Sequence, residues 1–208
     1  MIENESTPED STQDELWLIS YADMLTLLIG FFVLIIASVP LRRSSFERIA
    51  AAFSSTGRPA PLEELREKID QMVERTPELK DRVRTRDDAE GLGIEFKDAL
   101  LFDSGSAVLR SEARPTIGEI ARLLRELPGR AVTIEGHTDD VPINTRDFRS
   151  NWELSSQRAI NVLNALESAG VDRGRMSARA WAETRPLQTK GTVEQQRTAN
   201  RRVVIRVE

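Results

Sequence analysis

Cysteine is absent from this 208-residue chain, and histidine occurs only once. Without cysteine there can be no disulfide and no thiolate metal site, and a single imidazole is too little for a zinc site built on histidines. Positive charge is not in excess either, because the formal net charge is −5 at pH 7. A nucleic-acid-binding domain needs a basic face, so no nucleic-acid partner is expected.

The remaining composition suits one soluble domain with a small membrane part. Hydrophobic residues make up 39% of the chain and charged residues 30%, and the length leaves room for one globular domain plus a short extra segment. Residues 1–15 carry six acidic groups and no basic ones. Such a segment cannot bury a core, so it is predicted to be a disordered acidic tail.

A long apolar run follows the tail, from Leu16 to Val39. At 1.5 Å per residue it spans about 36 Å, enough to cross a bilayer core with some tilt. Trp17 and Tyr21 lie at one end, where amphipathic rings favour the membrane interface. A cleaved signal peptide is the alternative, but it would begin with a cationic leader and have a shorter apolar core. Residues 16–39 are therefore predicted to form one transmembrane helix.

Asp23 is the one acid inside this run, with Ser20, Tyr21 and Thr26 as its neighbours along the helix. A charge at the centre of a membrane costs about 2.5–3.5 kcal/mol even on the lenient insertion scale, so it usually marks an ion path. Small and polar residues let a partner helix approach closely. Ser20, Asp23, Gly30 and Ala37 are of this kind, and they share one stripe of the helix with Leu27 and Leu34. The alternatives are a protonated acid that only holds helices together, or a marginal helix that tolerates one acid.

Residues 40–90 are predicted to connect the membrane helix to a globular domain. Apolar residues recur at helical spacing just beyond the membrane, which predicts a short amphipathic helix; they include Phe46, Ile49 and Phe53. A second apolar stripe has heptad spacing, which favours a short paired helix; it consists of Leu62, Leu65, Ile69 and Met72. The charged residues 78–90 are expected to lead into the domain as a linker.

Strand and helix patterns alternate over residues 91–208. The predicted strands are 94–96, 132–136, 177–181 and 202–207, and the predicted helices begin near Ser111, Asn151 and Val193. This βαβαβαβ order predicts a compact α/β sandwich. With the membrane helix and the short helical linker, the whole chain is predicted to belong to the α+β class.

Two segments of this domain carry the chemistry: residues 136–140 at a strand end, and residues 151–159 at a helix start. Together they can present Asp139 and Arg158 to one pocket. A carboxylate beside a guanidinium suits a zwitterion, because the acid binds an ammonium and the arginine forks onto a carboxylate. The alternative is that the two residues simply form a structural salt bridge with each other.

Catalysis by His137 with Asp139 or Asp140 is a further hypothesis. It would need a nucleophile such as Ser155, but no Gly-x-Ser-x-Gly elbow surrounds that serine. A lone histidine at a strand end is more often a hydrogen-bonding loop residue. The chain is therefore not expected to be an enzyme.

The motifs resemble a known family over nearly the whole chain. Residues 17–26 resemble the membrane helix of MotB-type stator proteins, and residues 100–207 resemble the OmpA-like peptidoglycan-binding domain. Four short motifs in order carry the second likeness: residues 102–106, 136–139, 155–159 and 200–203. Asn151 to Ser155 resembles the form of this domain found in MotB.

This resemblance implies roles for residues of this chain. Asp23 would carry the motor's ion, a proton or sodium, and no cofactor is implied. Asp139 and Arg158 would hold the diaminopimelate side chain of peptidoglycan, in a site to which the matching motifs add His137, Thr138, Asp103 and Arg202. The segment with Phe46, Ile49 and Phe53 would be a plug that blocks ion flow until the motor assembles; the alternative is a helix lying on lipid.

The resemblance also implies a homodimer, a MotA-like polytopic partner and a bacterial inner-membrane location. The acidic tail would be cytoplasmic and the wall domain periplasmic, although the basic flank after the helix, Arg42 and Arg43, alone predicts the opposite orientation. The expected function is the wall-anchored stator subunit of a rotary motor, most readily a flagellar one. A non-flagellar motor such as Zorya-type phage defence and a passive peptidoglycan anchor are the alternatives.

Overall fold

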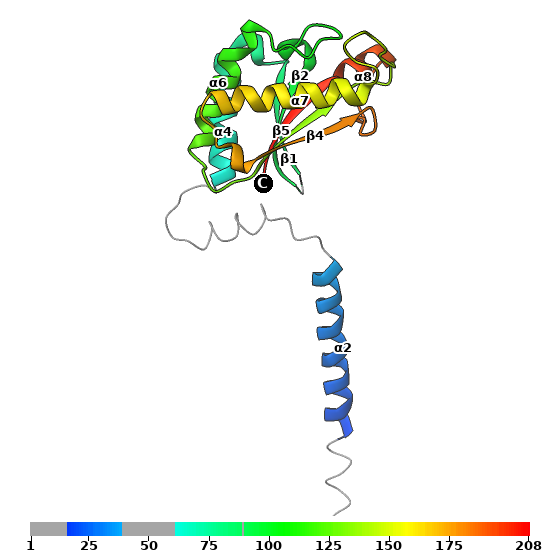
Figure 1. The fold of residues 1–208 in the computed structure, drawn as a ribbon. Helices are drawn as coiled ribbons and strands as arrows, with labels where there is room; N and C mark the ends of the chain where they lie inside the picture. The colour runs from blue at the N-terminus through cyan, green and yellow to red at the C-terminus, as the bar shows by residue number, and fades with distance from the viewer. Residues whose placement is uncertain (1–15, 39–60, 89) are drawn as a thin grey trace, which may run out of the picture. The chain divides into compact units, whose positions relative to one another are not determined.

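The computed structural model describes residues 16–38, 61–88 and 90–208, in two compact units that divide at Leu41. The first unit contains helix α2 (Leu16–Ser38). It is long and apolar enough to cross a membrane, as the sequence predicts (Figure 1). The expected plug segment with Phe46, Ile49 and Phe53 lies outside the described residues.

The second unit is built on a mixed five-stranded sheet of order β1-β2-β5-β3-β4. Strands β3 and β4 are parallel, and every other neighbouring pair is antiparallel. The strands are β1 (Val83–Asp88), β2 (Gly91–Lys97), β3 (Val132–His137), β4 (Met176–Ala182) and β5 (Arg202–Val207). The helices are α4 (Pro61–Arg75), α5 (Asp98–Leu101), α6 (Arg114–Arg125), α7 (Asn151–Ser168) and α8 (Val193–Asn200). From β2 onward, the predicted βαβαβαβ order is confirmed.

The core lies between one face of the sheet and the helices α4, α6 and α7. Figure 1 shows α7 lying across the sheet, and α6 packs against both α7 and α4. The strand register brings Ile94, Ile205 and Ile134 side by side on this face, and each is fully buried. Because side chains alternate across a strand, the apolar residues of β2, β3 and β5 all reach the same core. The core residues lie between positions 62 and 207, so this unit contains its own complete core and can fold by itself.

Strand β1 corrects the prediction that residues 78–90 form a linker. Val83–Asp88 pairs in antiparallel register with β2 along its whole length. Charged side chains do not prevent this pairing, because the ladder is made by backbone groups. They also suit an edge position, where charge discourages pairing with another chain. The sequence reasoning failed because it took high charge as evidence of irregular structure.

Helix α4 differs from the prediction of a short helix paired with another helix. Its heptad positions Leu62, Leu65 and Ile69 are buried in the core of the same unit. Polar side chains of α4 contact those of β1: Arg66 Nη1 lies 2.7 Å from Asp87 Oδ2, and the Thr85 hydroxyl donates to Asp70 at 2.7 Å. Two heptads define an apolar stripe but not what covers it, and here the stripe packs onto the sheet.

The other face of the sheet carries a buried network of charges. Arg206 lies 2.7 Å from both carboxylate oxygens of Asp88 and 3.3 Å from both oxygens of Glu135. Glu135 is 2% exposed. Although burial opposes ionisation, the nearby His137 ring and the hydrogen-bonded guanidinium of Arg206 lower the pKa of Glu135 to about 2. Glu135 is therefore ionised at neutral pH, and its charge is matched by Arg206.

Gly136 marks the closest approach of β3 to α7. A Cβ atom there would lie 2.1 Å from the carbonyl oxygen of Ser155, and backbone cannot move aside as a flexible side chain can. We therefore expect Gly136→Ala to lower the free energy of unfolding by about 1–3 kcal/mol, because overpacking forces the strand and helix apart. Urea unfolding of a fragment of residues 61–208 measures this change.

Gly118→Ala in α6 is the matched control. A Cβ at Gly118 meets no atom within 4 Å, and alanine favours helix over glycine by about 0.5–1 kcal/mol. The control should therefore raise stability while Gly136→Ala lowers it. Equal stabilities for Gly136→Ala and the natural sequence would show that β3 and α7 separate at little cost.

Candidate functional site

The strand ends β2, β3 and β5 meet at one edge of the sheet and support a cavity of about 560 Å³. The backbone N–H of Asp98, directly after β2, donates to the carbonyl of Arg201, directly before β5, at 2.9 Å. His137 at the end of β3 is in register with Arg202 at the start of β5. The segments adjoining these strand ends therefore line one space, beside the first turns of α7.

Asp139 lies in the loop that follows β3 and is 9% exposed. Its Oδ2 accepts a 2.6 Å hydrogen bond from Arg201 Nη1, and its Oδ1 accepts one from the Val141 N–H at 3.3 Å. The Asn151 side chain donates to the carbonyls of Asp139 and Val141 at 3.4 and 3.1 Å. Asn151 thus fixes this loop and does not cap α7. The cap is Ser150, which accepts from the Glu153 N–H.

Arg158 projects from α7 into the same cavity and is 2% exposed. Its Nη1 lies 2.9 Å from Asp98 Oδ1, and its Nε donates to the carbonyl of Ser106 at 2.9 Å. The guanidinium carbon also lies 5.1 Å from the centre of the Phe102 ring. A buried arginine is stable only when its charge is matched and its N–H groups are bonded. These three contacts supply most of that requirement.

Two acid–arginine pairs therefore line the cavity, Asp98 with Arg158 and Asp139 with Arg201. The prediction that Asp139 and Arg158 line one pocket is confirmed. The two residues do not form the salt bridge with each other that was considered as the alternative, because each pairs with another residue. Fixed charges of both signs in a partly enclosed, low-dielectric space can bind the ammonium and carboxylate of one zwitterion. Apolar walls from Phe102 and Leu154 suit the aliphatic chain of such a ligand.

Asp98 is a buried carboxyl group whose ionisation costs folding stability. Burial raises the pKa of its carboxyl to about 6, although the Arg158 guanidinium opposes this rise. A raised acid pKa means that protonated Asp98 stabilises the fold below about pH 4, and that this contribution is lost as the pH rises through about 6. At neutral pH the cavity thus contains a carboxylate that costs stability, which is common at binding sites.

The other residues predicted for this site divide into two groups. Thr138 lines the cavity, and its hydroxyl donates to the Asp139 carbonyl at 3.0 Å. Asp103, His137 and Arg202 do not line it. Asp103 is exposed and pairs with Arg110 at 2.8 Å, while Arg202 is buried and donates to the carbonyls of Arg185 and Asn200.

Strand alternation explains why His137 and Arg202 lie elsewhere. Gly136 faces α7, so its neighbour His137 points to the opposite face of the sheet, where its Nε2 is 3.7 Å from Glu135. Burial lowers the pKa of His137. Ser155 belongs to α7 and donates to the carbonyl of Trp152. The sheet therefore separates this serine from the histidine, and the geometry contains no catalytic pair of the kind considered from the sequence.

Asp98 and Arg201 are the site residues that the sequence reasoning missed. Arg201 directly precedes Arg202, the residue of the same motif that the sequence analysis assigned to the site. The start of β5 at Arg202 places the two arginines on opposite sides of the sheet edge, and this alternation was the available signal. Asp98 carried no comparable signal, because an acid after a strand is common at a helix start.

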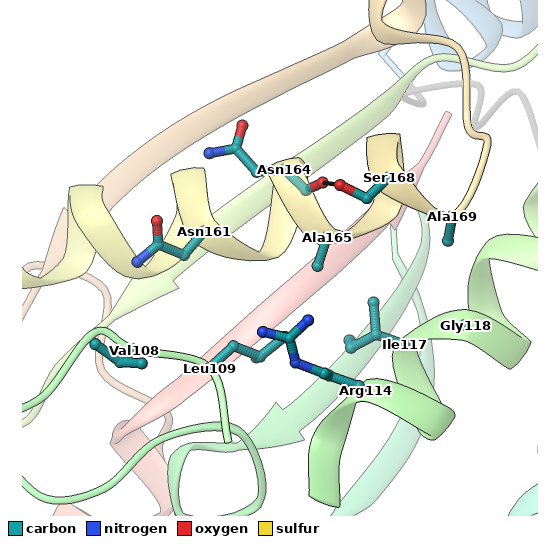
Figure 2. A pocket seen from close by; sticks show the side chains of 10 residues that line it. All are labelled: Val108, Leu109, Arg114, Ile117, Gly118, Asn161, Asn164, Ala165, Ser168 and Ala169. Carbon is teal, nitrogen blue, oxygen red and sulfur yellow. Dashed lines mark hydrogen bonds between the residues drawn. The ribbon is translucent and has the colours of Figure 1, made fainter. Parts of the chain in front are cut away.

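A second cavity, of about 480 Å³, lies between α6 and α7. Figure 2 shows Arg114 extending into it below Asn161, Asn164 and Ser168 of α7. Asn161 is already used to bind the Ala107 carbonyl at 2.6 Å. None of the charged or polar side chains that line this cavity is fully buried, so it lacks the fixed charges that distinguish the site around Arg158.

The membrane unit contains the second set of predicted residues. Asp23 is exposed on α2, and the Thr26 hydroxyl donates to the Asp23 backbone carbonyl at 2.8 Å. The Thr26 hydroxyl is therefore one helical turn from the carboxylate and is bonded to backbone. The rings of Trp17 and Tyr21 lie 6.5 Å apart at the start of the helix. An exposed acid in an apolar helix requires a polar partner or water within the membrane.

Comparison with protein-family models gives two matches in different parts of the chain. The OmpA family matches residues 101–201, which include every charged residue of the cavity except Asp98 and Lys97. A model described as "Membrane MotB of proton-channel complex MotA/MotB" matches residues 3–56, which include α2. The first match thus lies within the second unit, and the second match covers most of the first unit and continues past its boundary at Leu41.

Individual proteins show the same similarity. Motility protein B of Bacillus subtilis is 33% identical over 241 aligned residues, which cover 95% of this chain and 92% of that protein. The solved structure of the cell wall anchor of the type VI secretion system from Pseudomonas aeruginosa is 36% identical, with a TM-score of 0.55 over 61% of this chain and 87% of that one. The periplasmic domain of Helicobacter pylori MotB is 26% identical, with a TM-score of 0.56 over 61% and 81%.

Proposed function

We propose that this chain, which belongs to the Motility protein B family, is the ion-carrying and wall-anchored stator subunit of a flagellar motor. The observation that supports this proposal is that two features occur in the same chain. A membrane helix carries an acid at Asp23, and a separate unit carries a cavity with fixed charges of both signs. A passive anchor would need only the second feature. The relatives are motility and anchoring proteins and not enzymes.

Asp23 is the proposed ion carrier. Its carboxylate would take up a proton or sodium ion from one side, become neutral, and release the ion on the other side. An elementary charge that moves through 100 mV releases about 2.3 kcal/mol, which is the energy available for rotation. Ser20, Tyr21 and Thr26 surround Asp23 along α2 and would line the path. No cofactor takes part in this proposal.

The second unit is the proposed wall anchor. Its ligand would be the diaminopimelate side chain of peptidoglycan, whose end carries an ammonium and a carboxylate on one carbon. Arg158 would bind the carboxylate in a fork and Asp139 the ammonium, with Thr138 beside them. The likeness to a cell wall anchor of known structure supports this assignment.

The proposed assembly is a homodimer within a MotA-like polytopic partner in the bacterial inner membrane. Residues 1–15 would lie in the cytoplasm and the wall-binding unit in the periplasm, where peptidoglycan is found. The match to the MotA/MotB family model supports the partner, and the periplasmic domain of the Helicobacter pylori relative supports the orientation. The stripe of Asp23, Gly30 and Ala37 on α2 would face the neighbouring helices.

Ion conduction is tested most directly by removing the proposed plug. Deletion of residues 45–54, together with expression of the MotA-like partner, is expected to open the idle channel, load cells with protons or sodium, and slow growth. Intracellular pH and sodium indicators measure the influx. Adding Asp23→Asn to the same deletion should abolish the leak, because the carrier is gone. An unchanged ion content after the deletion would favour a helix on the lipid surface instead of a plug.

A further inference from the structure

Three contacts hold the guanidinium of Arg158 in the cavity. Asp98 Oδ1 lies 2.9 Å from Nη1, the Ser106 carbonyl accepts from Nε at 2.9 Å, and the Phe102 ring lies 5.1 Å from the guanidinium carbon. Nη2 makes no hydrogen bond to any described residue. Nε and Nη1 are thus engaged, and the two N–H groups of Nη2 remain available to a carboxylate in the cavity.

Asp98 differs from the other two contacts because it is charged, buried and incompletely bonded. It is 7% exposed, and its Oδ1 accepts no hydrogen bond of good geometry from the described chain. A purely structural ion pair would gain little here, since removing two charges from water costs about as much as their attraction returns. A fixed charge beside a binding arginine has a different use, because it determines the direction of the fork.

We propose that Asp98 is a positioning residue of the wall-binding site, whose carboxylate orients the Arg158 guanidinium so that its free Nη2 group binds the carboxylate of the ligand. This inference rests on the proposed wall-binding function and deepens it. Asp98 acts through Arg158 and does not itself contact the ligand. Protonation of Asp98 would remove the charge that orients the arginine, and would therefore weaken binding.

The groups that face Asp98 come from three other parts of the fold. They are Arg158 from α7, Arg201 before β5, and Asp139 after β3, and Lys97 of β2 also lines the cavity. Arginines keep their protons at every pH of interest, and Asp139 is paired with Arg201 at 2.6 Å. The pKa of Asp98, raised to about 6 by burial, places its titration in the range where the domain can be studied folded.

The test is the affinity of residues 61–208 for meso-diaminopimelate between about pH 5 and pH 8, measured by calorimetry. The amino and carboxyl groups of this ligand do not titrate there. With Asp98 titrating near pH 6, affinity at pH 5 should be about tenfold weaker than at pH 7. Asp98→Asn should bind at least tenfold more weakly than the natural sequence at pH 7, and its affinity should not change with pH.

The outcomes separate this inference from the function on which it rests. A pH-independent affinity of the natural sequence would overturn the role of Asp98 while leaving wall binding intact, and this comparison requires no folded variant. Asp98→Asn that binds normally at pH 7, or that loses affinity at low pH as steeply as the natural sequence, would overturn it too. Failure of the natural sequence to bind at any pH would overturn the wall-binding function, and the role of Asp98 with it.

Discussion

Cells that carry Asp23→Asn in place of the natural chain are expected to be non-motile, with torque reduced to the level of cells without the subunit. The amide has nearly the shape of the acid but cannot take up and release a proton or hold a sodium ion. Bead rotation and swimming measure torque, and membrane fractionation measures insertion. Because asparagine is less costly in a membrane than a charged aspartate, the variant should insert and assemble normally.

Two further variants of α2 make this result specific. Asp23→Glu keeps the carboxylate but moves it by one methylene, so a fraction of the torque should remain. Ser38→Ala is the matched control, since its hydroxyl only donates to the Leu34 carbonyl near the end of the helix, and it should rotate normally. Full torque from Asp23→Asn would remove the ion-carrying role from this residue.

The second large effect is expected at Arg158. Losing one partner of a desolvated charged contact costs about 2–5 kcal/mol, so Arg158→Ala should weaken the pelleting of residues 61–208 with purified peptidoglycan by more than tenfold. Arg158→Lys should recover little, because an ammonium cannot fork onto a carboxylate or reach both Asp98 and the Ser106 carbonyl. Competition by free diaminopimelate should release the bound natural fragment.

Melting temperatures of the same variants separate binding from folding. Arg158 is buried beside Asp98, so its removal also lowers stability, and binding must be measured well below the melting temperature. Arg173→Ala is the matched control, because this arginine is 65% exposed and, among the described residues, pairs with Glu167 alone. A folded Arg158→Ala variant that pellets like the control would exclude this arginine from the wall site.

The free site has a consequence for how a ligand binds. Asp139 and Arg201 are paired at 2.6 Å, so in the proposed wall-binding mode an incoming ammonium would compete with Arg201 for the Asp139 carboxylate. Arg201 is about one-third exposed and can turn toward Glu194, which lies 3.6 Å away. Arg158 is buried and cannot move in this way. The site thus combines one fixed arginine, Arg158, with one adjustable arginine, Arg201. The ion pair that the ligand would break, Asp139 with Arg201, is the more exposed of the two and the less costly to break.

The sequence by itself determined the features that depend on local pattern. The length and apolarity of residues 16–39 define a membrane helix, and Asp23 is conspicuous there because charge is expensive in lipid. The strand and helix patterns of residues 91–208 predicted the order of β2, β3, β4 and β5, since side chains alternate with a period of two in a strand and 3.6 in a helix. The presence of Asp139 and Arg158 in one cavity followed because a strand end and a helix start meet at a sheet edge.

Only the tertiary structure decided what covers each surface and which of two neighbours reaches the site. The apolar stripe of Leu62, Leu65 and Ile69 looks the same whether it meets another helix or a sheet, and the sheet covers it here. Strand β1 pairs through its backbone, which the charge of its side chains does not reveal. Arg201 rather than Arg202 lines the cavity because β5 begins between them, and a shift of one residue reverses the face of a side chain. Asp98 joins the site only through burial beside Arg158, a contact between residues 60 positions apart that no local pattern contains.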